Sequence, residues 1–271
     1  MKYLKLIPSL LITAVIASLW YDSFIFLLVI VFFFWLFVPI AIAALYFTIK
    51  ARRCRNTYEK VTVALGLLNL LFLSVTIAWL CSNAPSPERM AKHYDRHQDD
   101  IEQLVQYTRQ SLDPGAYLHL EFERGKTSIF QAQGKNGSLL SQDWYDDNSI
   151  MNAAGLTQEE FTEIHRLLRQ ADCIGITLSS GRDDDSTAVV DWRRDLMGMY
   201  SYILFDRPTT PQEDSTFLAD PMYIPYTDRV ILQYSGGAIG PQSFTHEEKE
   251  SFLTNHPPAS PTVSRHKTDT P

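Results

Sequence analysis

Three long runs without a charged residue occupy the first third of the chain. They cover residues 6–21, 23–49 and 61–83, and they are 16, 27 and 23 residues long. At about 1.5 Å per residue, a helix over either of the two longer runs would cross a hydrocarbon layer of about 30 Å. A helix in lipid satisfies its own backbone amides, whereas an open strand does not. We therefore expect residues 1–83 to form a membrane region of three transmembrane helices.

Charge is divided unevenly along the chain and predicts the orientation of this region. Residues 1–81 carry seven Lys and Arg against two Asp and Glu, a net charge of +5, and the other 190 residues carry 17 against 29, a net charge of −12. Positive loops stay on the cytoplasmic side of a membrane. The basic loop between the second and third runs holds Lys50, Arg52, Arg53, Arg55 and Lys60. We expect a cytoplasmic amino terminus and an extracytoplasmic carboxyl part in a cell membrane, such as a bacterial inner membrane.

The first run has a second interpretation, because Lys2 and Lys5 followed by a short apolar stretch also describe a secretory signal peptide. No clean A-x-A cleavage pair follows, so a retained helix is favoured. The three runs contain no Asp, Glu, Lys, Arg or His, which argues against an ion or proton pathway. Gly66 and Asn69 favour helix association, through close approach and an interhelical hydrogen bond.

The rest of the chain has the pattern of an α+β domain with a mainly antiparallel sheet. Helices are predicted at 86–112, 157–171 and 245–253, each behind a Ser or Thr that can cap it. Alternating apolar and polar residues predict strands at 117–123, 127–132, 174–178, 188–192, 197–205 and 230–234. Residues 133–156 and 207–228 are expected to be irregular. We divide the chain into a membrane region (1–83), a juxtamembrane stalk helix (84–115), an extracytoplasmic domain (116–254) and a disordered tail (255–271).

Two histidines four residues apart, His93 and His97, could meet one metal ion from a helix. The sequence departs from the H-E-x-x-H pattern, because Tyr94 stands where the glutamate would be. We interpret this pair as packed or interfacial side chains.

Two turns also carry chemistry-bearing residues. Asp183, Asp184 and Asp185 concentrate carboxylates, but they lack the alternate spacing of a calcium loop, and an exposed hairpin tip is favoured. The glycines of residues 235–240 superficially suggest a phosphate loop, but no Lys-Ser or Lys-Thr pair follows.

His119, Glu121 and Glu123 alternate along one predicted strand and could form an acid and base group. A row of this kind is more often a solvated strand face. Cys81 and Cys173 could pair in an oxidising compartment, at a distance that the sequence does not give.

The sequence predicts no catalytic, cofactor-binding or metal-ligating residue, no cofactor and no nucleic-acid binding, since clustered cations are lacking outside the membrane region. The favoured hypothesis is a non-enzymatic multi-pass membrane protein whose acidic domain binds a protein or envelope partner, with the lipid bilayer itself as a partner. The alternative hypothesis is a membrane-tethered hydrolase that uses His119 with Glu121 or Glu123.

Overall fold

The structure is a computed structural model, and it divides into two compact units, residues 1–84 and 85–271. The residues that it describes are 7–21, 39–46, 48–50, 57–83, 85–123, 125–135, 137–179, 187–194, 198–236 and 242–257.

The first unit contains helices α1 (Ile7–Tyr21) and α3 (Thr57–Asn83), which pack against each other. A buried polar contact joins them at Asn69. The Thr13 hydroxyl donates to Asn69 Oδ1 at 2.7 Å, and Asn69 Nδ2 donates to the Ser9 carbonyl at 3.0 Å. The expected interhelical hydrogen bond of Asn69 is therefore present.

The predicted membrane region is contradicted by the structure. Among the residues described, no helix is both long enough and apolar enough to cross a bilayer. The run at 6–21 yields a helix of 15 residues, about 22 Å long and short of the roughly 30 Å required. Most of the run at 23–49 lies outside the described residues, since nothing is described at 22–38.

Predictions that rested on three transmembrane helices are corrected with it. These are the multi-pass membrane localisation with a cytoplasmic amino terminus, the extracytoplasmic position of the carboxyl part, and both membrane-based functional hypotheses. An uncharged run in the sequence limits polarity but does not by itself fix the length of the helix that forms. The expected protein or envelope partner stays an untested prediction.

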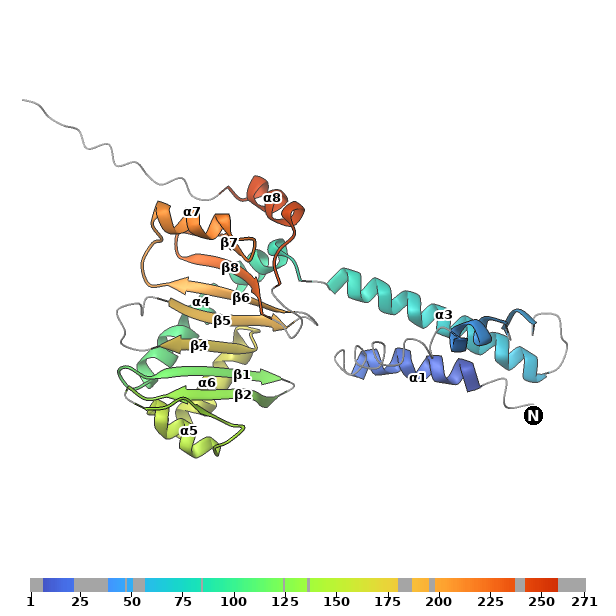
Figure 1. The fold of residues 1–271 in the computed structure, drawn as a ribbon, viewed down its shortest axis with the longest axis horizontal. Helices are drawn as coiled ribbons and strands as arrows, with labels where there is room; N and C mark the ends of the chain where they lie inside the picture. The colour runs from blue at the N-terminus through green and yellow to red at the C-terminus, as the bar shows by residue number, and fades with distance from the viewer. Residues whose placement is uncertain are drawn as a thin grey trace, which may run out of the picture. The chain divides into compact units, whose positions relative to one another are not determined.

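The second unit is built on one eight-stranded antiparallel sheet (Figure 1). Its strand order is β3-β2-β1-β4-β5-β6-β8-β7, so the predicted hairpin and three-stranded meander lie side by side at its centre. The strands are β1 (Tyr117–Glu123), β2 (Lys126–Gln133), β3 (Leu140–Ser141), β4 (Gly175–Ser179), β5 (Thr187–Arg194), β6 (Met199–Phe205), β7 (Tyr223–Pro225) and β8 (Val230–Ser235). The prediction of an antiparallel sheet with helices is thus confirmed.

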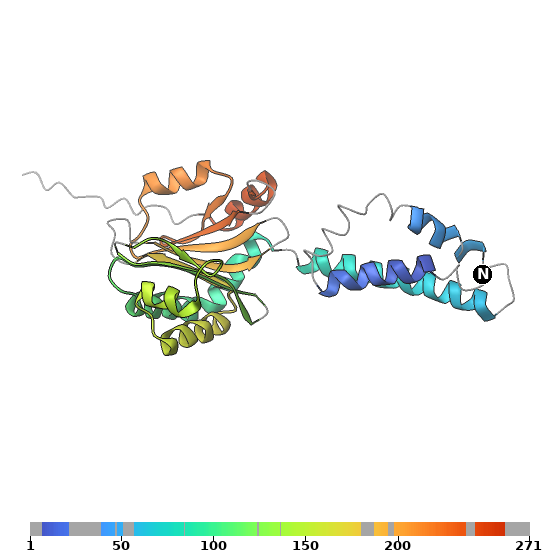
Figure 2. The same cartoon turned by 60° about the horizontal axis from the view of Figure 1, so that its bottom comes forward.

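Helices α4 (Pro87–Ser111), α5 (Asp147–Ala154) and α6 (Gln158–Gln170) cover one face of this sheet (Figure 2). Capping explains where two of them begin, because the Ser86 side chain accepts from the Arg89 amide and Thr157 forms a capping box with Glu160. Helix α7 (Pro211–Ala219) packs against β7 on the other side of the sheet (Figure 2), and α8 (His246–Asn255) contacts α4.

The core lies between the sheet and the three helices. Strand alternation puts one set of side chains there, and these are fully or almost fully buried: Leu118, Leu120, Ile176, Leu178, Ala188 and Val190. The helices contribute Met90, Ile101, Leu104, Ile150, Ile164 and Leu168. The alternate strand residues therefore lie on the opposite face, where the polar side chains of the central strands gather.

Two segments expected to be irregular contain regular elements. Helix α5 lies within 133–156, where Asp146 caps its start and Gly155, at φ +78°, ends it in the left-handed conformation. Helix α7 and strand β7 lie within 207–228, and the Thr210–Glu213 capping box starts α7. Both helices are short, so their capping residues are the main signal that the sequence offers.

Candidate functional site

His119 and Glu121 lie two residues apart on the central strand β1 and share the sheet face opposite α4 and α6. Their neighbours Leu118 and Leu120 point into the core and are fully buried, so the strand cannot rotate these polar side chains away. His119 is partly exposed and Glu121 is buried. The core side of β1 thus fixes where its polar side chains point.

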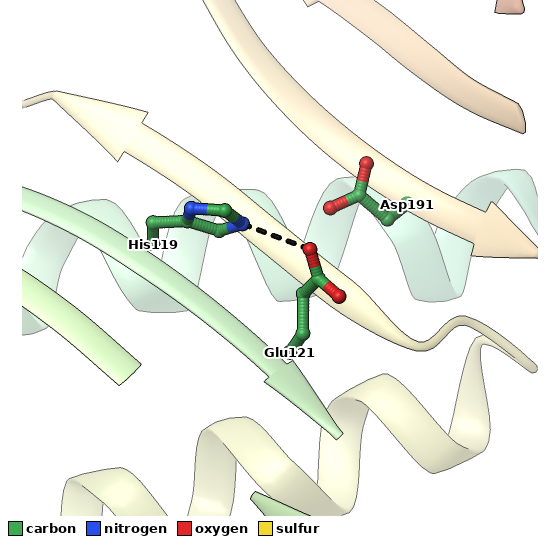
Figure 3. A group of neighbouring side chains, drawn as sticks. All are labelled: His119, Glu121 and Asp191. Atoms are coloured by element: carbon green, nitrogen blue, oxygen red, sulfur yellow. Dashed lines mark hydrogen bonds and ion pairs between the residues drawn. The ribbon is translucent and has the colours of Figure 1, made fainter. Parts of the chain in front are cut away.

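Strand pairing extends this pair into a polar row across four strands. The register places Glu121 opposite Gly175, Gly175 opposite Asp191, and Asp191 opposite Ser201. Figure 3 shows the Glu121 and Asp191 side chains approaching each other above β4, with His119 beside Glu121. Residues 70 positions apart in the sequence therefore meet on one surface.

Gly175 makes this approach feasible. A Cβ atom at this position would lie 2.8 Å from Glu121 Cγ, 2.9 Å from Asp191 Oδ2 and 2.9 Å from the Leu120 carbonyl oxygen. The space that any other side chain would fill is used by the two carboxyl groups instead.

A register shift between β5 and β6 brings the Arg194 guanidinium to Glu121. The β5–β6 register shifts between Asp191 and Arg193, so that Arg194 returns to the face that carries Asp191. The Arg194 guanidinium bonds Glu121 Oε2 while remaining half exposed. A second register shift, next to Glu121 in the β1–β2 pair, also borders the site. Bulges are common beside functional sites because they redirect individual side chains.

Glu121 accepts hydrogen bonds from two side chains, His119 and Arg194. Its Oε1 accepts from His119 Nε2 at 3.0 Å, as Figure 3 marks, and its Oε2 accepts from Arg194. Burial opposes ionisation of this carboxyl, but the His119 hydrogen bond and the Arg194 charge outweigh burial and lower the Glu121 pKa. Glu121 is therefore an ionised carboxylate near neutral pH.

Asp191 accepts its hydrogen bond from a neutral hydroxyl, whereas Glu121 also bonds a guanidinium. Its side chain is buried, Oδ1 accepts from the Ser201 hydroxyl at 2.7 Å, and Oδ2 lies 2.9 Å from the position that a Cβ at residue 175 would take. Burial raises the Asp191 pKa to about 6, and the Ser201 hydrogen bond only partly offsets that effect. At neutral pH the site therefore holds a buried negative charge with one neutral donor.

His119, Glu121 and Asp191 together resemble the ligand set of a metal ion. One ligand atom from each lies within 4.8 Å of the others. Tetrahedral coordination at bond lengths of about 2.0–2.1 Å places ligand atoms about 3.3 Å apart, so small side-chain rotations would complete the geometry. Figure 3 shows all three side chains on the same side of the sheet.

The sequence pattern indicated two members of this cluster, His119 and Glu121, as candidates, and it missed Asp191. Glu123, the third residue of the predicted row, is exposed at the end of β1 and lies outside the cluster. Asp191, Arg194 and Ser201 were not singled out. An aspartate inside an otherwise apolar strand is uncommon and was the available signal for the first of these.

His93 and His97 stack in α4, with ring centroids 4.8 Å apart, but each has a separate partner. The Tyr202 hydroxyl donates to the Met90 carbonyl at 3.0 Å, so His93 Nδ1 donates to Tyr202 at 2.9 Å. His97 Nδ1 lies 3.4 Å from Asp100. This packed arrangement agrees with the interpretation of these histidines as structural.

Acid should destabilise the second unit through His93. Burial, aided by the His97 charge, lowers the His93 pKa to about 4 from an ordinary value of 6.5. Between these values the unfolded chain binds the proton and the folded chain does not, so stability is complete above pH 6.5 and falls toward pH 4. As the pH falls over this range, the free energy of unfolding should drop in both chains, and the drop should be about 1–2 kcal/mol smaller in the His93→Phe variant than in the parent chain.

Urea unfolding at several pH values from 4.5 to 7 measures this difference. His246→Phe is the matched control, because His246 is a strongly exposed histidine on α8. Equal pH slopes for the His93→Phe variant and the parent chain would contradict the assignment.

The other candidates from the sequence, the aspartate turn, the glycine-rich segment and Cys173, form no site among the described residues. Asp183, Asp184 and Asp185 lie outside the described residues, as do residues 237–241 of the glycine-rich segment. Cys173 is a free buried thiol whose pKa is raised by burial. The pairing of Cys81 with Cys173 that the sequence leaves open stays an untested prediction.

Comparison with known protein families, with curated proteins and with solved structures finds no match to this chain. The fold and the site describe an α+β domain whose eight-stranded antiparallel sheet carries a cluster of one imidazole and two carboxyl groups.

Proposed function

We propose that the second unit binds a divalent transition-metal ion through His119, Glu121 and Asp191. The observation that supports this most directly is the convergence of one ligand atom each from His119, Glu121 and Asp191 within 4.8 Å of one another, with the buried Asp191 Oδ2 at the space above Gly175. A buried carboxylate is costly unless a cation or several hydrogen bonds compensate it. A metal ion at this point would neutralise both carboxylates at once.

The donor set favours a metal of intermediate hardness. One imidazole nitrogen with two carboxylate oxygens suits Zn²⁺ and its first-row neighbours, whereas Ca²⁺ requires six to eight oxygen ligands. Three protein ligands leave a coordination position for a water molecule or an exogenous ligand. Of the possible ions, Zn²⁺ is the one we propose.

The metal-free contacts are compatible with loading. His119 would bind the ion through Nε2 as the neutral tautomer protonated at Nδ1, so the proton that Nε2 now donates to Glu121 would move to the other ring nitrogen. Arg194 bonds the other carboxylate oxygen, so it can stay in place while Oε1 turns to the metal. Because His119 is partly exposed, the ion can arrive from the solvent side.

Zinc titration of the metal-free 271-residue chain tests the proposal. We expect one tight site, and at free Zn²⁺ of 100 times Kd a stabilisation of about 2.7 kcal/mol. For a domain of this size, that gain raises the Tm by about 5–10 °C. Calorimetric titration gives the stoichiometry and thermal unfolding gives the shift.

Variants locate the site. His119→Ala should lose this stoichiometric binding, whereas Glu123→Gln should keep it, because Glu123 is an exposed carboxylate on the same strand outside the cluster. Absence of a tight site in the parent chain, or a site that survives His119→Ala unchanged, would refute the proposal.

A further inference from the structure

We propose that the metal-loaded site binds an oxyanion, held jointly by the metal ion and the Arg194 guanidinium. This inference rests on the proposed metal function and adds the chemical class of the exogenous ligand. The shared chemistry is that of a phosphate or a carboxylate group.

Charge is the first argument. With neutral His119, ionised Glu121 and Asp191, and cationic Arg194, the metal-free cluster has a net charge of −1. A divalent ion changes this value to +1. A partly buried excess charge is unfavourable without a counterion, so loading converts a site that repels anions into one that attracts them.

The unused donors of Arg194 are the second argument. Its guanidinium carries five N–H donors, and the structure shows one of its nitrogens engaged, with Glu121 Oε2. The side chain is half exposed, so the remaining edge of the guanidinium is accessible. A planar guanidinium binds phosphate and carboxylate oxygens in a bidentate manner, which a single metal position does not provide.

Position is the third argument. The cluster lies on the sheet face opposite α4 and α6; His119 and Arg194 are partly exposed, whereas Glu121, which both of them contact, is buried. An exogenous ligand that reached the metal ion from the solvent side would therefore pass the exposed part of Arg194. One oxyanion can contact both.

The neighbouring residue supplies a matched control. The Arg193 guanidinium lies 5.0 Å from the centre of the Trp192 ring, and the register pairs Arg193 with Tyr200, a residue of the core face. Two consecutive arginines with the same charge therefore serve different surfaces. An effect of overall charge would be shared by both, and an effect of the site would belong to Arg194.

The experiment uses Co²⁺ as a spectroscopic substitute for Zn²⁺ in the 271-residue chain, with inorganic phosphate and acetate as separate probes. We expect the visible Co²⁺ spectrum to change with anion concentration until it saturates. The anion with the lower dissociation constant in this titration identifies phosphate or carboxylate as the preferred group. Arg194→Gln should weaken anion binding at least tenfold, yet bind Co²⁺ as tightly as the parent chain or more tightly, since a neighbouring positive charge is removed. Arg194→Lys should recover part of the anion affinity, and Arg193→Gln should leave it unchanged.

Each result has a distinct meaning. Co²⁺ binding without a spectral response to either anion would overturn the oxyanion inference alone, as would equal anion affinity in the Arg194→Gln and Arg193→Gln variants. Failure of Co²⁺ to bind would overturn the proposed metal function together with this inference.

Discussion

Asp191→Asn should make the metal-free protein more stable at pH 8, by about 1–3 kcal/mol. The Asp191 pKa is about 6 in the folded protein against an ordinary value of 3.8, so folding disfavours the charged form. The penalty is complete above pH 6, decreases as the pH falls, and is absent below pH 3.8. Asparagine has nearly the same shape, stays neutral and keeps an oxygen that can accept from Ser201.

Urea unfolding at pH 8 and at pH 4 measures the effect. The gain should be present at pH 8 and nearly absent at pH 4, where both chains are neutral at this position. Glu123→Gln removes an exposed carboxylate from the same face of the sheet and should change stability by less than about 0.5 kcal/mol. A variant that is less stable than the parent at pH 8 would show that the Asp191 charge stabilises the metal-free fold.

Zinc should reverse which of the two chains, the parent or Asp191→Asn, is the more stable. The parent gains binding energy from the ion and Asp191→Asn loses a ligand, so the variant is the more stable protein without Zn²⁺ and the less stable one with it. A residue that destabilises the fold until a ligand binds is characteristic of a functional position, because a purely structural one has no such cost to offset.

Gly175→Ala should have the largest destabilising effect, about 2–3 kcal/mol. The added Cβ would lie 2.9 Å from the Leu120 carbonyl oxygen, a backbone atom of the central strand that cannot move without disturbing the β1–β4 pairing. It would also separate Glu121 from Asp191, since both carboxyl groups occupy that space. We therefore expect stability and zinc binding to be lost together.

Thermal unfolding and zinc titration of the same sample check this prediction. Gly137→Ala is the matched control, because a Cβ there would lie 3.6 Å from its nearest neighbour, the Gly134 nitrogen, and the residue is exposed. If Gly175→Ala bound Zn²⁺ like the parent chain, the cluster would not require the space above this glycine.

Much of the second unit could be predicted from the sequence. The alternation at 117–123 and at 188–192 predicted central strands, and Ser86, Thr157 and Thr245 predicted where helices begin. These signals are local: a strand alternates with a period of two residues, and a cap lies within three residues of the amide that it bonds. The first third of the chain shows the limit of such signals, because its uncharged runs predict transmembrane helices and the described helices contradict that prediction.

Local pattern by itself determined that His119 and Glu121 share one face of a strand, since alternate side chains of a strand always do. Only the tertiary structure decided that Asp191 joins them. That meeting depends on the register of three strands and on a glycine between two carboxyl groups, and the arrival of Arg194 depends on a register shift after Asp191. Register and bulges are set by how the whole sheet packs on its core, and pairings between residues distant in the chain leave little trace in the spacing of either segment.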